Sequence, residues 1–163
     1  MSDSPKKTSS FATALKQVLQ HTHAGTALIS SAIVDQQLQD ALLTRMRKLS
    51  RKLTDSLFSG YGPLSSFCAK IDLAFALELI DETTHDRLTT ARKIRNLFAH
   101  SDEFLTFDSP EVSDILRKLP YTGGNALNNQ NLYVWHLTQV ESHLVSVAGP
   151  SILKPSPHKH AGA

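Results

Sequence analysis

The chain is poor in cysteine and in net charge. Among its 163 residues there is one cysteine, Cys68, so no disulfide can form within the chain. Such a cysteine content is typical of proteins kept in a reducing, intracellular setting, which favours a cytoplasmic location. The formal net charge is only +2, which is too weak by itself to indicate a partner made of nucleic acid.

Long hydrophobic runs are missing as well. No apolar stretch approaches the roughly 18 residues of a membrane-spanning helix, so we expect no membrane partner. The first ten residues, MSDSPKKTSS, lack the apolar centre of a secretory signal. Neither a strand-like alternation nor an internal repeat is visible, which excludes β-sheet and repeat architectures.

The chain does contain enough apolar residues to form the core of one compact domain. The chain is 40% apolar and 20% charged, a globular composition, and its length suits a single core. We expect residues 1–10 to be a disordered N-terminus, 11–149 to be the helical domain, and 150–163 to be a flexible tail. The tail holds His158 and His160, but two histidines without further ligands do not predict a metal site, and no cofactor is expected.

The apolar period between these ends is helical, so the sequence predicts an all-α, single-domain bundle of about six helices. The helix from Ser66 to Ile80 is apolar nearly all round and should be the buried central helix. Ser65 and Asp81 can cap the helices that follow them, and Ser109-Pro110-Glu111 is a typical helix start. The expected helices span Phe11–His21, Gly25–Leu49, Ser66–Ile80, 82–100, 110–119 and Leu132–Val147.

The segment ARKIRNLFAHS, from Ala91 to Ser101, places an arginine among apolar residues. On a helical wheel Arg95 falls inside the apolar arc of its helix. Inward-facing carboxylates are available at Asp35 and Asp72, with Glu78 a further choice. Because an unpaired buried charge is costly, we expect Arg95 to pair with one of them, which makes Asp35, Asp72 and Arg95 a structural polar cluster.

The same helix carries a second polar stripe. Arg92, Asn96 and His100 follow one another at i, i+4 and i+8, so they share one side and could face a ligand. His100 ends the helix, where it can cap carbonyl groups or transfer protons near neutral pH. Cys68 lacks a basic neighbour in sequence and is expected to be a small core residue rather than a nucleophile.

A cluster of cations ends the long second predicted helix. The stretch RMRKLSRK holds five basic residues, which either contact phosphates or form a solvated helix end: Arg45, Arg47, Lys48, Arg51 and Lys52. No helix-turn-helix with a basic recognition helix is visible. The sequence therefore predicts no direct, sequence-specific DNA binding.

Three segments resemble the mannitol operon repressor (MltR-like) family. They are GTALISSAIVDQQLQDAL (25–42), LFSGYGPLSSFCAKIDLAFALELI (57–80) and ARKIRNLFAHS (91–101). Asp35 and Asp72 match the family pattern, whereas Cys68 stands where Ser is usual and Glu78 where Gly is usual. The resemblance implies a regulator of sugar-alcohol uptake genes that acts through protein partners, such as a transcription factor or a transport component.

A wider resemblance is to HEPN-type helical domains, through Arg95-Asn96 followed by His100. That resemblance implies an alternative function, a metal-independent ribonuclease or toxin, often a homodimer. His100 would then act as general acid or base and Arg95 would offset phosphate charge. Arg95 and His100 lie about 140° apart on one helix, so such a site needs a second subunit or another element. We expect the regulatory, non-enzymatic function, and the direction in which Arg95 points distinguishes the two.

Overall fold

The computed structural model describes the backbone of residues 10–148 and the side chains from residue 22 onward, and it confirms an all-α bundle. The described part contains no strand and six helices: α1 (Ser10–Arg45), α2 (Arg51–Phe58), α3 (Phe67–Ala76), α4 (Glu82–His100), α5 (Pro110–Leu116) and α6 (Asn129–Ala148). Residues 1–9 of the predicted disordered start at 1–10 and the predicted tail at 150–163 lie outside the described residues, and Ser10 begins α1. Within the described range, no helix is both long and apolar enough to span a bilayer.

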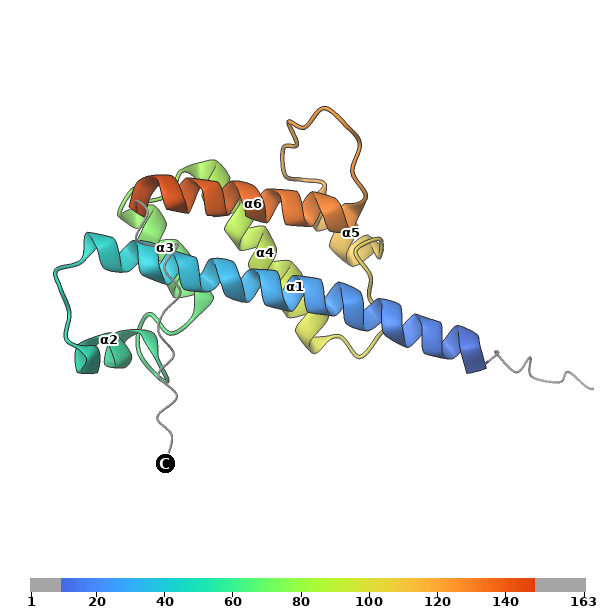
Figure 1. Cartoon of the computed structure of the whole chain (residues 1–163), viewed down its shortest axis with the longest axis horizontal. Coiled ribbons are helices and arrows are strands. Elements are labelled where there is room, and N and C mark those ends of the chain that lie inside the picture. Colours follow the sequence, from blue (N-terminus) through green and yellow to red (C-terminus); the bar gives the residue numbers. More distant parts are fainter. Residues whose placement is uncertain (1–9, 149–163) are drawn as a thin grey trace, which may run out of the picture.

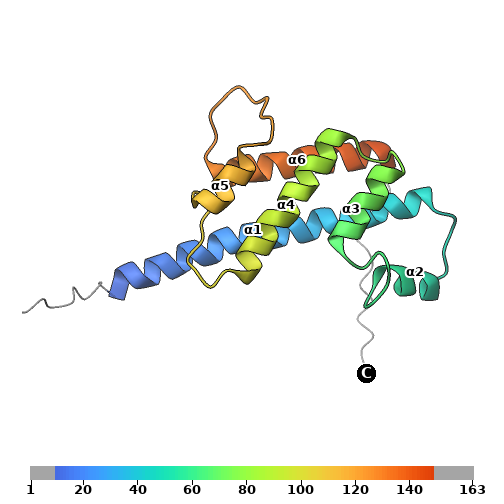
Figure 2. The same ribbon diagram turned by 180° about the vertical axis from the view of Figure 1, so that it is seen from behind.

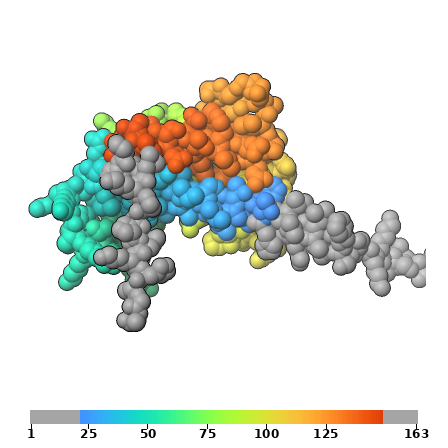
Figure 3. All heavy atoms as spheres, viewed as in Figure 1, coloured from blue at the N-terminus to red at the C-terminus, as the bar shows by residue number. Residues whose placement is uncertain are grey.

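Helices α1 and α6 lie side by side and run in the same direction (Figures 1 and 3). Three side-chain hydrogen bonds join them in rising register. Gln130 Nε2 donates to Thr26 Oγ1 at 2.9 Å, Ser31 Oγ and Tyr133 Oη lie 2.8 Å apart, and Gln37 Nε2 donates to Glu141 Oε1 at 2.9 Å. Because positions in both helices increase together, the pairing is parallel.

Helices α3 and α4 form a hairpin that crosses the α1–α6 pair on the side that faces the viewer in Figure 2. Helix α5 packs where α4 and α6 meet. The core lies between α1, α4 and α6, where the most deeply buried side chains include Leu38, Leu88, Ile94, Val140 and Leu144. Burying these aliphatic side chains, at about 25 cal/mol per Å² of apolar surface, is the main stabilising term.

The first two predicted helices form a single helix in the structure. The sequence indicated a break between His21 and Gly25, but α1 runs through both positions. A glycine inside a helix costs about 1 kcal/mol relative to alanine, and the long contact of α1 with α6 and α4 offsets that loss. Helix α2, in turn, was not predicted, because its eight residues carry too few apolar positions to show a period.

The prediction that the third helix is the central, buried one is wrong. Helix α3 ends at Ala76 instead of Ile80, and it leaves Phe75 44% exposed and, just beyond its end, Leu77 50% exposed. An apolar circumference does not require burial all round, because folded proteins keep much apolar surface exposed. The centre of the bundle belongs to α1, α4 and α6.

The predicted helix starts are mostly confirmed. Asp81 caps α4, its Oδ1 accepting from the Thr84 amide at 2.7 Å, and that bond lowers the pKa of the Asp81 carboxyl. Ser66 rather than Ser65 caps α3, accepting from the Ala69 amide at 3.1 Å. Pro110 opens α5 after Ser109, as predicted, although the Ser109 hydroxyl accepts from Thr106 instead of from the helix.

The end of α3 explains the unusual residue at position 78. The Leu79 amide donates to Ala74 O at 2.9 Å and the Glu78 amide donates to Phe75 O at 3.0 Å. These two bonds form a Schellman motif, which requires a left-handed residue directly after the helix cap. Glu78 fills that position with φ of +53°, a conformation that glycine adopts without strain.

Candidate functional site

Helix α4 presents part of the predicted ligand-facing stripe to a hollow of about 490 Å³ beside α5. Asn96 and His100 line this α4–α5 hollow, both exposed, and Lys93 joins them. Leu97 and Ile115 supply its apolar surface, and Ser101 also lines it. The lining of the hollow thus combines apolar side chains with an ammonium group, an amide and an imidazole.

The two arginines of the motif are placed differently. Arg92 is half-buried and is not among the residues that line the α4–α5 hollow, so the predicted stripe of three reduces to Asn96 and His100. Arg95 is also half-buried, on the side of α4 near Tyr133. Burial raises the pKa of the Tyr133 phenol, and the positive charge of Arg95 opposes that rise. Arg95 therefore does not line the α4–α5 hollow that His100 lines.

The predicted cluster of Asp35, Asp72 and Arg95 is not assembled. Asp35 pairs instead with Lys70 of α3, with Nζ and Oδ1 2.5 Å apart and the lysine side chain only 6% exposed. Asp72 is exposed and accepts a weak hydrogen bond from Cys68 Sγ at 3.6 Å. No ion pair within the described residues includes Arg95. The prediction that Arg95 pairs with Asp35 or Asp72 is therefore wrong.

The reason is the position of α3. Lys70 projects from α3 into its contact with α1 and reaches the carboxylate of Asp35 there. Arg95 is partly exposed, and a long charged side chain in such a place does not require a buried carboxylate partner. An ion pair between helices is therefore present, but Lys70 and Asp35 form it.

Tyr133 forms a second internal polar contact. Its ring is 1% exposed, and its hydroxyl lies 2.8 Å from Ser31 Oγ and 3.3 Å from Ala27 O. Burial raises the pKa of Tyr133 to about 12, while the hydrogen bond from Ser31 and the charge of Arg95 oppose that rise. The phenol is therefore a neutral structural donor between α6 and α1.

Three residues of this region were missed from the sequence. Lys93 could have been found, because it precedes Asn96 and His100 by three and seven positions and so shares their face. Lys70 and His136 carry no such signal, since lysine and histidine usually lie at surfaces. His136 is nonetheless 1% exposed, and neither ring nitrogen has a hydrogen-bond partner.

In the described part of the chain, no group of three or more His, Cys, Asp or Glu side chains is placed to hold a metal ion. The two tail histidines, His158 and His160, for which no metal site was predicted, lie outside the described residues. The residues that line the α4–α5 hollow offer a ligand hydrogen bonds, positive charge and apolar contact.

Comparisons with known proteins give one structural likeness. No protein-family model matches the chain, and no curated protein matches it either. Among solved structures, the chain is similar to a chain of the X-ray structure of the MtlR–HPr complex from Escherichia coli, with a TM-score of 0.52 and 14% sequence identity. The likeness covers 82% of this chain and 91% of that one, so the two share a fold over most of their lengths.

Proposed function

We propose that this chain is a cytoplasmic regulator of genes for sugar-alcohol uptake and use, such as those for mannitol, and that it acts through a protein partner of the HPr kind. The observation that carries the proposal is the fold shared with the MtlR–HPr structure over most of both chains. Residues 25–42, 57–80 and 91–101 resemble the mannitol operon repressor family, which led us to the same proposal, although no family model matches the chain.

The α4–α5 hollow is the surface we assign to the partner. Interfaces commonly combine apolar and polar side chains, and Leu97 and Ile115 line this hollow together with Lys93, Asn96 and His100. A partner with a carboxylate beside an apolar side chain would complement this surface.

Calorimetric titration with HPr from the same organism tests the proposal. We expect binding by the wild-type chain, and we expect Lys93→Glu to weaken it at least tenfold, because the reversal places a like charge against the partner's carboxylate. Lys52→Glu, an exposed charge reversal on α2, is the matched control and should bind as wild type. A reporter for mannitol uptake genes should respond to deletion of the gene and to Lys93→Glu in the same direction.

Two results would reject this function. One is the absence of HPr binding at micromolar concentration together with an unchanged reporter. The other is RNA cleavage that depends on His100, which would establish the ribonuclease alternative. The structure gives that alternative no support within one chain, because His100 lines the hollow and Arg95 does not, and the structural likeness adds none.

A further inference from the structure

The junction between α1 and α2 concentrates the positive charge of the chain. Residues 45–52 hold five of its 17 Lys and Arg and none of its 15 Asp and Glu, so acidic residues outnumber basic ones in the rest of the sequence. We call these five cations the basic junction: Arg45, Arg47, Lys48, Arg51 and Lys52. All five are exposed. The weak net charge of +2 therefore hides a strongly polarised molecule.

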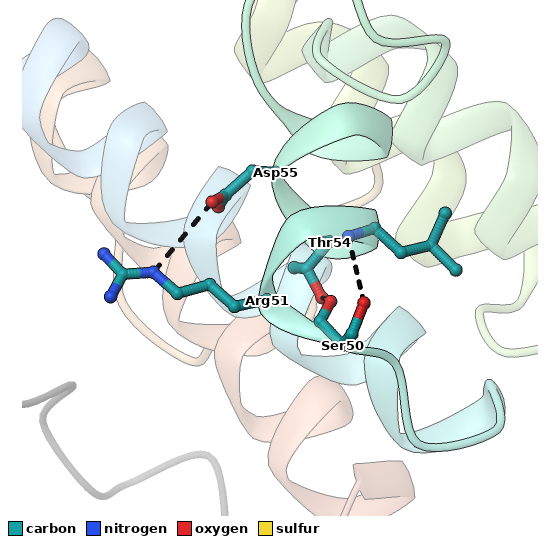
Figure 4. Close-up of polar contacts among 5 residues, drawn as sticks. Ser50, Arg51, Thr54 and Asp55 are labelled. Atoms are coloured by element: carbon teal, nitrogen blue, oxygen red, sulfur yellow. Dashed lines mark hydrogen bonds and ion pairs between the residues drawn. The ribbon is translucent and has the colours of Figure 1, made fainter.

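The cations of the basic junction have almost no counter-charge within the described part of the chain. One ion pair involves them, between Arg51 Nε and Asp55 Oδ2 at 4.0 Å (Figure 4), and both side chains are largely in solvent, at 97% and 65% exposure. Such an exposed pair contributes little. The junction thus presents a nearly uncompensated positive potential.

Local helix stability does not explain Arg51 and Lys52. They occupy the first turn of α2, where the helix dipole favours acidic side chains, and that turn holds no acid. Ser50 caps the helix through its hydroxyl, which accepts from the Leu53 amide at 3.3 Å. Residues that oppose a local preference without a structural gain mark functional surfaces.

An exposed aromatic ring lies at the other end of α2. Tyr61 follows the helix by three residues and is fully exposed, with no described ring contact. An eight-residue helix is about 12 Å long, so the ring and the basic junction flank one short element. Figures 1 and 2 show α2 standing apart from the main bundle, at the opposite end from α5.

From these observations we propose that the basic junction and Tyr61 form a sequence-independent binding surface for single-stranded nucleic acid. Cations that follow the phosphates, together with an aromatic ring on which a base can stack, are the two features such surfaces need. A bilayer fits less well, because α2 turns Phe58 into the domain and leaves Leu53 as its exposed apolar residue. This surface is separate from the α4–α5 hollow and does not rest on the proposed function.

Fluorescence anisotropy with labelled 20-nucleotide strands of mixed sequence tests the proposal on the full chain. We expect binding at 50 mM salt, with equal affinity within about threefold for DNA and RNA strands, because phosphates and base faces are common to both. If about four phosphates are contacted, raising the salt to 200 mM should weaken binding about 50-fold.

Three variants separate binding from folding. Arg51→Glu with Lys52→Glu should weaken binding at least about tenfold and flatten the salt dependence, since two phosphate contacts are lost. The same double reversal places acids at the start of α2, so the melting temperature should not fall. Tyr61→Ala should weaken binding about fivefold or more with an unchanged salt dependence. Arg117→Glu with Lys118→Glu, an exposed pair at α5, is the matched control and should bind as wild type.

Several outcomes would overturn the assignment. These are no binding at 50 mM salt, wild-type affinity in the Arg51/Lys52 variant, or an equal loss in the Arg117/Lys118 control. Tighter binding to a duplex of the same length, or to vesicles with anionic lipids, would assign the basic junction to another class of partner.

Discussion

Lys70 holds an ammonium group inside the contact between α1 and α3, where Asp35 offsets its charge at 2.5 Å. Removing the carboxylate would leave that charge buried and unpaired. We therefore expect Asp35→Ala to lower the free energy of unfolding by about 3 kcal/mol or more, as measured by urea denaturation. Asp72→Ala, which removes an exposed carboxylate, is the control and should change the stability by less than about 0.5 kcal/mol.

The same pair offers a rescue test. Lys70→Met keeps an unbranched chain of similar volume without the charge, so the Asp35→Ala, Lys70→Met double variant should recover most of the lost stability. If the double variant is as unstable as Asp35→Ala alone, the loss comes from packing, and the ion-pair explanation is wrong.

His136 should make the stability depend on pH. Burial, and then the charge of Arg87, lower the pKa of His136 to about 4 in the folded chain, whereas the unfolded residue titrates near its ordinary value of about 6.5. Between these two pH values the unfolded chain binds more protons. The contribution of the neutral imidazole is therefore complete above about pH 6.5 and is lost as the pH falls toward about 4.

The expected loss over that range is on the order of 3 kcal/mol. It should be seen as a falling urea midpoint between pH 6.5 and pH 4. His136→Phe should flatten this part of the pH profile, while His100→Phe, at an exposed position, should leave it as in the wild type. An unchanged profile in His136→Phe would assign the pH dependence to other groups.

Among the elements, the turn after α3 carries the clearest backbone strain. Glu78 has φ of +53°, a conformation that costs a non-glycine residue about 1–2 kcal/mol. Glycine removes this strain but gives back part of the gain through its more flexible unfolded state. We expect Glu78→Gly to raise the free energy of unfolding by up to about 1 kcal/mol, measured as a higher melting temperature.

Asn tolerates the left-handed conformation better than other non-glycine residues, so Glu78→Asn should lie between wild type and Glu78→Gly. Glu78→Val, which is β-branched, should be less stable than wild type. The reverse order among these three would show that the Glu78 side chain, not its backbone, determines the stability of the turn.

The elements also show which local signals the sequence carries. The cap of α4 at Asp81 and the proline start of α5 were predictable, because side chain and backbone interact within three residues. The continuity of α1 was not, because it depends on packing against α6, more than a hundred positions away. The strained turn at Glu78 could be suspected from the glycine usual in the family, but its reason needed the Schellman hydrogen bonds.

At the level of the whole molecule, the helical class followed from periodicity, whereas the candidate site followed only in part. A helical wheel correctly grouped Asn96 with His100, since both line the α4–α5 hollow. It could not tell which carboxylate meets which cation, because that depends on how α3 is placed against α1. Lys70 of α3 pairs with Asp35, the carboxylate that was expected to pair with Arg95.

That arrangement decides what we expect of the ribonuclease alternative. His100 lines the α4–α5 hollow, while Arg95 lies about 140° around the same helix and near Tyr133. One chain therefore cannot bring both side chains to one phosphate, and cleavage would need a second subunit to supply the missing group.

We expect the purified protein to leave single-stranded RNA intact in EDTA, even at concentrations that saturate binding at the basic junction. The assay is gel analysis of the labelled RNA, with the oligomeric state followed by light scattering in the same samples. Cleavage that accompanies dimer formation and disappears in a folded His100→Ala variant would show that two chains build the site that one chain lacks.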